Sequence, residues 1–178
     1  MYIPIILGTA REGRQSEKAA NYVLGEVRKN KDIETELIDV RDFLTKRTDN
    51  TRRLPEAKKL SSKISKADGI IIVSPEYNHG YPGELKIMLD LIYEDFHKKP
   101  VAFCGVSAGG LGGARMIEQL RQVVIELHMV PIREAVYFSN IKSLFDEKGQ
   151  ITDQSYSKRM GVMLDELLWY AKALKKAG

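Results

Sequence analysis

The segment from Gly8 to Ser16, GTAREGRQS, combines arginines and hydroxyl groups with the beginning of an expected helix. Guanidinium groups form forked, charge-assisted hydrogen bonds to phosphate oxygens. Unpaired backbone amides at the start of a helix bind the same kind of group. Arg11 and Arg14, with the hydroxyls of Thr9 and Ser16, therefore predict an anion site, and a solvated turn is the alternative interpretation.

Two familiar phosphate-binding patterns do not fit this segment. Gly8 and Gly13 have the separation of a Walker A loop, but Arg14 and Gln15 stand where that loop has Lys followed by Ser or Thr. The dinucleotide fingerprint needs a second glycine where this chain has Ala10. The segment therefore predicts a terminal phosphate held without a metal ion.

A second polar loop follows the apolar run 70–73, IIIV, whose β-branched character is typical of a central parallel strand covered on both faces. Pro75 lacks the backbone N–H that a sheet ladder needs, so we expect the strand to stop before it. The polar and aromatic residues 76–81 would then lie at the carboxyl end of a strand, where open α/β sheets bind ligands. An ordinary connecting loop is the alternative.

A third loop, at 107–113, is rich in glycine. Such a loop lets backbone amides approach a ligand closely, although a glycine cluster alone could simply be flexible. Together the three loops would supply a phosphate-binding site, a polar and aromatic surface and a glycine-rich side of one pocket. That combination suits a flat aromatic ring that carries a phosphate tail, as in flavin mononucleotide (FMN).

Alternating strands and helices are expected to bring these loops together. Strands are expected at 2–7, 34–40, 70–73, 101–106 and 129–137, and helices at 16–30, 55–66, 84–93, 114–127 and 152–176. We expect Ser16 to cap the first helix. The pattern predicts an α/β fold, a flavodoxin-like three-layer sandwich with a five-stranded parallel sheet in the order 2-1-3-4-5, as a single domain over residues 1–178. The loops after strands one, three and four would then share one edge of the sheet.

Composition excludes several classes of protein. The 178 residues have a formal net charge of +4 and no apolar run near the roughly 18 to 20 residues of a membrane-spanning helix. The basic residues are scattered, so neither nucleic acid nor a membrane is an expected partner. No side-chain cluster has the spacing of a metal site. Cys104, the single cysteine, lies in an apolar run and is expected in the core, and a cytoplasmic location is the default.

The three motifs resemble those of the NADPH-dependent FMN reductases, a flavodoxin-like family that includes quinone, chromate and azo-dye reductases. They read G-T-x-R-x-G-R-x-S, then S-P-E-Y-N-x-G-x-P-G-x-L-K-x-x-L-D, then S-x-G-G-x-G-G, within residues 3–136. The resemblance implies FMN and NADPH as cofactors, with NADH as an alternative to NADPH. It also implies an oxidoreductase that passes two electrons from NADPH through FMN to a quinone or similar small acceptor.

The same resemblance assigns binding residues. It implies that the FMN phosphate is held by Thr9, Arg11, Arg14, Gln15 and Ser16, that the isoalloxazine ring lies against Pro75, Glu76, Tyr77 and Asn78, largely through main-chain groups, and that the other edge of the ring is closed by Ser107, Ala108, Gly109 and Gly110. Relatives often have serine in place of Thr9, a change that keeps the hydroxyl. The segment 41–53 matches no pattern, so the acceptor stays open.

The flavin would carry the chemistry, so no side chain is expected to be catalytic, and His79 is expected to shape the pocket rather than transfer protons. Two other functions use the same fold and flavin. One is a flavodoxin-type electron carrier, although such carriers are typically acidic and this chain is basic. The other is a flavin-binding redox sensor without NADPH turnover of its own. A reductase that serves a partner enzyme would show the same motifs.

The helix at 84–93 bears on assembly. Ile87 and Leu91 lie outside its main apolar stripe. A second apolar face is typical of a helix that meets another subunit, so we expect a homodimer or homotetramer. Partial burial under a neighbouring loop is the alternative.

Overall fold

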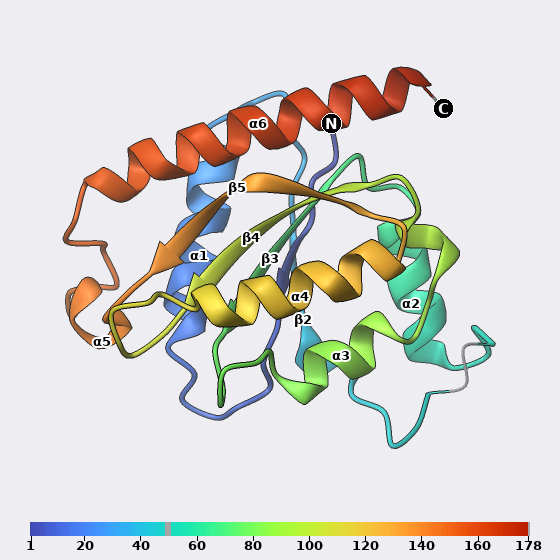
Figure 1. The fold of residues 1–178 in the computed structure, drawn as a ribbon, viewed down its shortest axis with the longest axis horizontal. Helices are drawn as coiled ribbons and strands as arrows, with labels where there is room; N and C mark the ends of the chain where they lie inside the picture. Colours follow the sequence, from blue (N-terminus) through green and yellow to red (C-terminus); the bar gives the residue numbers. More distant parts are fainter. Residues whose placement is uncertain (49–50, 178) are drawn as a thin grey trace.

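A parallel sheet forms the centre of the chain in the computed structural model, which describes residues 1–48 and 51–177. Its strands are β1 (Ile5–Leu7), β2 (Leu37–Asp39), β3 (Ile70–Pro75), β4 (Pro100–Val106) and β5 (Val130–Phe138). They pair in the order β2-β1-β3-β4-β5, and every pairing is parallel (Figure 1). The predicted flavodoxin-like order is confirmed.

Helices cover both faces of this sheet. They are α1 (Ser16–Arg28), α2 (Pro55–Ile64), α3 (Gly83–Leu89), α4 (Ala114–Glu126), α5 (Ile141–Leu144) and α6 (Ser155–Ala177), with short 3₁₀ helices η1 (Val40–Phe43) and η2 (Glu94–Phe96). One core cluster joins the sheet to α1 and α6, and the other joins it to α2, α3 and α4. The predicted three-layer sandwich is therefore confirmed.

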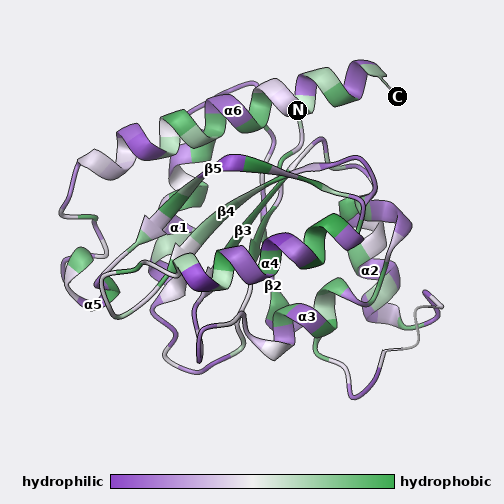
Figure 2. Ribbon diagram, viewed as in Figure 1, coloured by the Kyte–Doolittle hydropathy of each residue, from purple (hydrophilic) through white to green (hydrophobic). Residues whose placement is uncertain are grey.

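The sequence of β3 accounts for this layering. Ile71 and Val73 pack in the cluster with α1 and α6, whereas Ile70 and Ile72 pack in the cluster with α2, α3 and α4. Side chains alternate between the two faces of a strand, so a strand covered on both faces needs apolar residues at every position. Figure 2 shows the strands mostly in the hydrophobic colour, whereas the helices carry both colours.

The end of β3 differs from the prediction. Ser74 and Pro75 continue the pairing with β4, and the next hydrogen bond runs from the Glu76 amide to the Val106 carbonyl at 2.9 Å. Pro75 lacks only a donor, and the amide that follows it supplies the next bond in the ladder. The pairing with β4 therefore continues up to the loop, and it fixes the position of the Glu76 backbone.

The predicted second apolar face of the α3 region is only partly present. Leu91 is 1% exposed and belongs to the core, whereas Ile87 is 36% exposed. The chain turns after α3 and folds Leu91 inward, so a helical pattern extended through residue 93 was wrong. The homodimer or homotetramer stays a prediction.

Two other expectations concern single features. Cys104 is buried, and that burial raises the pKa of its thiol well above the ordinary value, as expected for a core residue. In the part of the chain that the structure describes, no helix is both long and apolar enough to cross a membrane. The single domain over residues 1–178 stays a proposal, supported by the one sheet and its two clusters.

Candidate functional site

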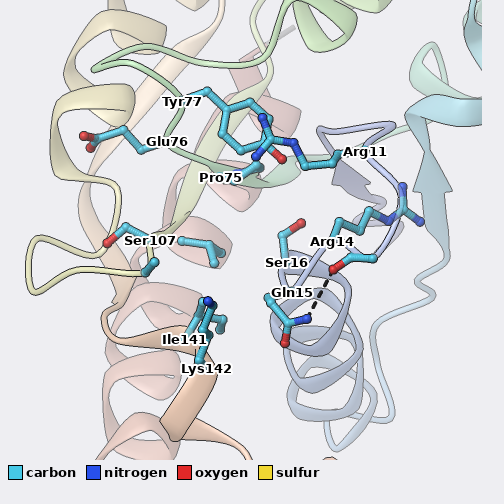
Figure 3. Close-up of a pocket in the computed structure, with 13 residues that line it drawn as sticks. Arg11, Arg14, Gln15, Ser16, Pro75, Glu76, Tyr77, Ser107, Ile141 and Lys142 are labelled. Carbon is cyan, nitrogen blue, oxygen red and sulfur yellow. Dashed lines mark hydrogen bonds between the residues drawn. The ribbon is translucent and has the colours of Figure 1, made fainter.

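A pocket of about 260 Å³ lies at the carboxyl edge of the sheet, between the loops that follow β1, β3 and β4 (Figure 3). β1 and β3 are the neighbours at which this sheet order reverses its direction. Open α/β sheets bind ligands at that switch point. The residues that line the pocket are Arg11, Gly13, Arg14, Gln15, Ser16, Pro75, Glu76, Tyr77, Val106, Ser107, Ala108, Ile141 and Lys142.

The loop after β1 lies close to its neighbours. A methyl group at Gly8 would come within 3.1 Å of the Ser74 hydroxyl oxygen and 3.0 Å of a Leu85 methyl group. Gly13 has a φ of +62°, a conformation that side chains other than glycine rarely adopt. These two glycines let the chain turn tightly from β1 into α1, which brings the start of α1 to the pocket.

Arg14 is turned away from the pocket. Its side chain is 1% exposed and donates hydrogen bonds from Nη1 to Asp39 Oδ1 at 2.8 Å and to the Thr9 carbonyl at 2.6 Å. Nη2 pairs with Asp39 Oδ2, and Nε lies 3.3 Å from Glu17 Oε2. Figure 3 shows its guanidinium pointing toward β2. The guanidinium of Arg14 thus stabilises the loop, while the rest of the residue lines the pocket.

Asp39 is a supporting residue that the motifs did not include. Burial raises the pKa of its carboxyl, but hydrogen bonds from Arg14 and from the Arg41 amide outweigh that effect and bring the pKa below its ordinary value. The carboxylate therefore stays ionised beside Arg14 at neutral pH. Its position at the end of β2 joins β2 to the loop after β1.

Ser16 has an unpaired hydroxyl group inside the pocket wall. The residue is 2% exposed, and its Oγ finds no hydrogen-bond partner among the described residues. The prediction that Ser16 caps α1 is wrong, because Gln15 occupies the cap position and Ser16 is the first residue of the helix. Buried hydroxyls are nearly always hydrogen-bonded, so this one fits a ligand oxygen.

Arg11 and Tyr77 join the loops after β1 and β3. The Arg11 guanidinium carbon lies 3.7 Å from the centroid of the Tyr77 ring, which is a cation–π contact. The Tyr77 hydroxyl lies 3.2 Å from the hydroxyl of Thr9, which is fully buried beneath it. The two loops therefore form one continuous wall of the pocket.

The loop after β3 is a tight hairpin turn. Tyr77 and Gly80 exchange two backbone hydrogen bonds of 2.9 Å, and Asn78 and His79 between them have φ values of +50° and +69°. Two positive φ angles are those of a type I′ turn, which is unusual without glycine. Both residues are exposed at the tip of the loop.

Glu76 braces the same loop against α4. Its side chain is 5% exposed and accepts a hydrogen bond of 2.7 Å from Arg115 Nε through Oε1. Figure 3 shows the carboxylate pointing away from Arg11 and Tyr77. The carboxylate of Glu76 is therefore engaged with α4, and its expected main-chain contact with the isoalloxazine ring stays a prediction.

The glycines of the loop after β4 fall into two groups. Gly112 and Gly113 have φ values of +59° and +85°, and a methyl group at Gly113 would come within 2.7 Å of the Val106 nitrogen. Gly109 and Gly110 have nothing within 4 Å of such a methyl group. The first pair is needed to close the loop, with Gly112 against Tyr137 of β5 and Gly113 against β4, whereas the second pair leaves space beside the loop.

The pocket brings together nine of the predicted residues and leaves four beside it. Nine line it, and those that do not are Thr9, Asn78, Gly109 and Gly110. Thr9 contacts the hydroxyl of Tyr77, and Asn78 and Gly109 each follow a lining residue in the sequence, with Gly110 one position further along. The motifs missed Ile141 and Lys142, which come from α5. Their position after the fifth strand could have pointed to them, because every loop at that edge of a parallel sheet can reach the site.

Comparison with known proteins gives the class to which this arrangement belongs. The profile of the family described as NADPH-dependent FMN reductase matches residues 1–143. The chain belongs to this family, and its cofactors are FMN and NAD(P)H. The pocket fits such a cofactor, because the unpaired Ser16 hydroxyl lies at the start of α1, where helices bind phosphate.

Particular relatives extend over almost the whole chain. The FMN-dependent NADPH-azoreductase of Staphylococcus saprophyticus is 28% identical over 178 residues, which cover 94% of each chain. A 2-hydroxy-1,4-benzoquinone reductase from Burkholderia sp. is 28% identical over 171 residues and 92% of each chain. The solved structure of FerB, a flavoenzyme NAD(P)H:(acceptor) oxidoreductase from Paracoccus denitrificans, shares the fold with a TM-score of 0.81 and 21% identity, covering 96% of this chain and 97% of FerB.

Proposed function

We propose that the protein is an FMN-dependent NAD(P)H oxidoreductase that passes two electrons from NADPH to a quinone or similar small acceptor. The observation that carries the proposal is the buried, unpaired Ser16 hydroxyl at the start of α1, in a pocket at the switch point of the sheet. A phosphate at that point would pair the hydroxyl and meet the positive end of a 13-residue helix.

Each wall of the pocket would hold a different part of FMN. Ser16 and the backbone of Gln15 would bind the phosphate, with Arg11 placed beside them to neutralise it. The main chain from Pro75 to Asn78 would contact the isoalloxazine ring. Ser107 and the backbone around Gly109 would contact the other edge of the ring. The space beside Gly109 is open, so a ring can approach the backbone there.

Bound FMN would supply the redox chemistry, a two-electron transfer from NADPH to the acceptor. The protein binds the cofactor, orients its ring and leaves one side of it open to the two substrates in turn. We assign no acid or base role to a side chain. His79 lies at the exposed tip of a turn and is not one of the residues that line the pocket, so we give it no proton-transfer role.

Two relatives guide the proposed acceptor. One is named an azoreductase and the other a 2-hydroxy-1,4-benzoquinone reductase, and both cover more than nine tenths of this chain. Quinones and azo dyes are both flat, conjugated two-electron acceptors that can stack on a flavin. A benzoquinone is therefore the first acceptor to test, with an azo dye second. The cytoplasmic location stays a prediction.

Steady-state kinetics test the proposal. The FMN-loaded protein is assayed with NADPH or NADH against a benzoquinone, an azo dye and free FMN. Double-reciprocal plots with parallel lines are expected for the quinone, since one open side of the ring must serve both substrates in turn. Flavin binding without turnover of any of the acceptors would contradict the proposed function and favour an electron carrier or sensor.

A further inference from the structure

The charges around the pocket are unevenly paired. Four of its lining residues carry a charge at neutral pH: Arg11, Arg14, Glu76 and Lys142. Arg14 is engaged with Asp39 and Glu17, and Glu76 is engaged with Arg115. Within the described residues, no carboxylate pairs with Arg11 or Lys142. Among the residues that the structure describes, Arg11 and Lys142 are therefore the two cations of the pocket that lack an anionic partner.

Lys142 stands on the side of the pocket opposite α1. It is the second residue of α5, and the amide of Ile141 before it donates a 3.1 Å hydrogen bond to the Ser107 carbonyl. This bond fixes the start of α5 to the loop after β4. Figure 3 shows Ile141 and Lys142 across the pocket from Gln15 and Ser16. The start of α5 is thus held in place, and the side chain of Lys142 is exposed.

We propose that Lys142 is a specificity-determining residue that selects flavin carrying a phosphate group over flavin without one. The inference rests on the proposed function, because it assumes that FMN occupies the pocket. A phosphate monoester has a charge near −1.5 to −2 at pH 7. Arg11 and Lys142 supply the matching positive charge, because Asp39 already neutralises the guanidinium of Arg14.

The unpaired hydroxyl of Ser16 lines the same pocket as these two cations. A phosphate bound to it would have the α1 amides beneath it, Arg11 on one side and Lys142 on the other. Charge-assisted hydrogen bonds are stronger than neutral ones. Lys142 would therefore bind the phosphate and leave the ring contacts unchanged, so its loss would affect FMN and spare riboflavin.

Equilibrium binding of two flavins tests the proposal. Apoprotein is titrated into FMN or riboflavin, and the quenching of flavin fluorescence gives each dissociation constant. Lys142→Gln should weaken FMN binding about tenfold at low salt and leave riboflavin binding unchanged. Lys142→Arg should restore most of the FMN affinity. The FMN affinity of Lys142→Gln should also fall less steeply with added salt than that of the wild type.

Lys148→Gln is the matched control, because Lys148 is exposed in a nearby turn and does not line the pocket. Circular dichroism of each variant checks that it is folded. Equal losses for FMN and riboflavin, or an unchanged FMN affinity in Lys142→Gln, would overturn the inference while the proposed function stands. A wild-type protein that binds neither flavin would overturn both.

Discussion

Arg14 and Asp39 form a forked ion pair that links the loop after β1 to the end of β2. Each terminal nitrogen of the guanidinium pairs with a separate carboxylate oxygen, although the residues are 25 positions apart in the sequence. The same guanidinium holds the Thr9 carbonyl at 2.6 Å. The loop that would bind the flavin phosphate is therefore held in shape by its own protein contacts before any ligand enters.

Asp39→Asn should destabilise the fold by about 1 to 3 kcal/mol, because it removes the forked partner of the buried Arg14 cation and leaves only the more distant carboxylate of Glu17. Urea unfolding followed by circular dichroism measures this change. Asp42→Asn is the matched control, since Asp42 pairs with Lys59 on the surface and such pairs contribute about 1 kcal/mol or less. Equal losses in the two variants would show that the Arg14 pair has no special role.

The pH dependence of stability follows from the same pair. The pKa of Asp39 is lower in the folded protein than in the unfolded chain, because the bonds from Arg14 and the Arg41 amide outweigh burial. A group of this kind stabilises the fold above its unfolded pKa, near 3.9, and loses that contribution as the pH falls through its folded pKa. The stability difference between wild type and Asp39→Asn should be constant from pH 5 to 7 and should shrink below about pH 4. A difference that grows in acid would contradict this.

Much of the fold could be predicted from local patterns, and the supporting contacts could not. The β-branched run at 70–73 predicts a strand covered on both faces, which the packing of Ile71 and Ile72 confirms. The pairing of Arg14 with Asp39 depends on how β2 lies beside β1, which no local pattern contains. The role of Lys142 in the pocket could not be predicted for the same reason. Lysine is common on surfaces, and only the topology brings this one to the pocket.

The Tyr77 ring should matter more than its hydroxyl for FMN binding. Tyr77→Phe keeps the surface on which Arg11 stacks and loses only the 3.2 Å contact to Thr9. Tyr77→Leu removes the cation–π contact, which is worth roughly 0.5 to 1 kcal/mol at exposed sites, so FMN should bind up to about fivefold more weakly. Fluorescence titration measures both variants. The same loss in Phe and Leu would assign the effect to the hydroxyl.

His79 lies in a strained backbone conformation that glycine would adopt without steric strain. His79→Gly should raise the free energy of unfolding by about 0.5 to 1 kcal/mol, because its φ of +69° is unfavourable for any side chain. His79→Ala keeps that strain and should show no gain. Both variants should retain NADPH oxidation within about threefold of wild type. A loss of turnover well beyond this, with FMN still bound, would point to proton transfer by His79.

Glycine is required at one end of the loop after β4 and not at the other. Gly113→Ala should destabilise the fold by about 2 to 3 kcal/mol, because the added methyl group would collide with the backbone of Val106 and Gly105 at a φ of +85°. Gly109→Ala adds a methyl group to open space and should change stability by less than about 0.5 kcal/mol. Thermal unfolding of the apoproteins measures both, and a large loss at Gly109 would mean that the loop is packed differently.

The visible spectrum of the purified protein, recorded without oxygen before and after NADPH and then a benzoquinone, tests the proposed function most directly. We expect a bound-flavin spectrum that bleaches when NADPH is added and returns when the quinone is added. A flavin that NADPH does not bleach would contradict the reductase function. A protein that shows no flavin, even after reconstitution with excess FMN, would contradict the assignment of the pocket itself.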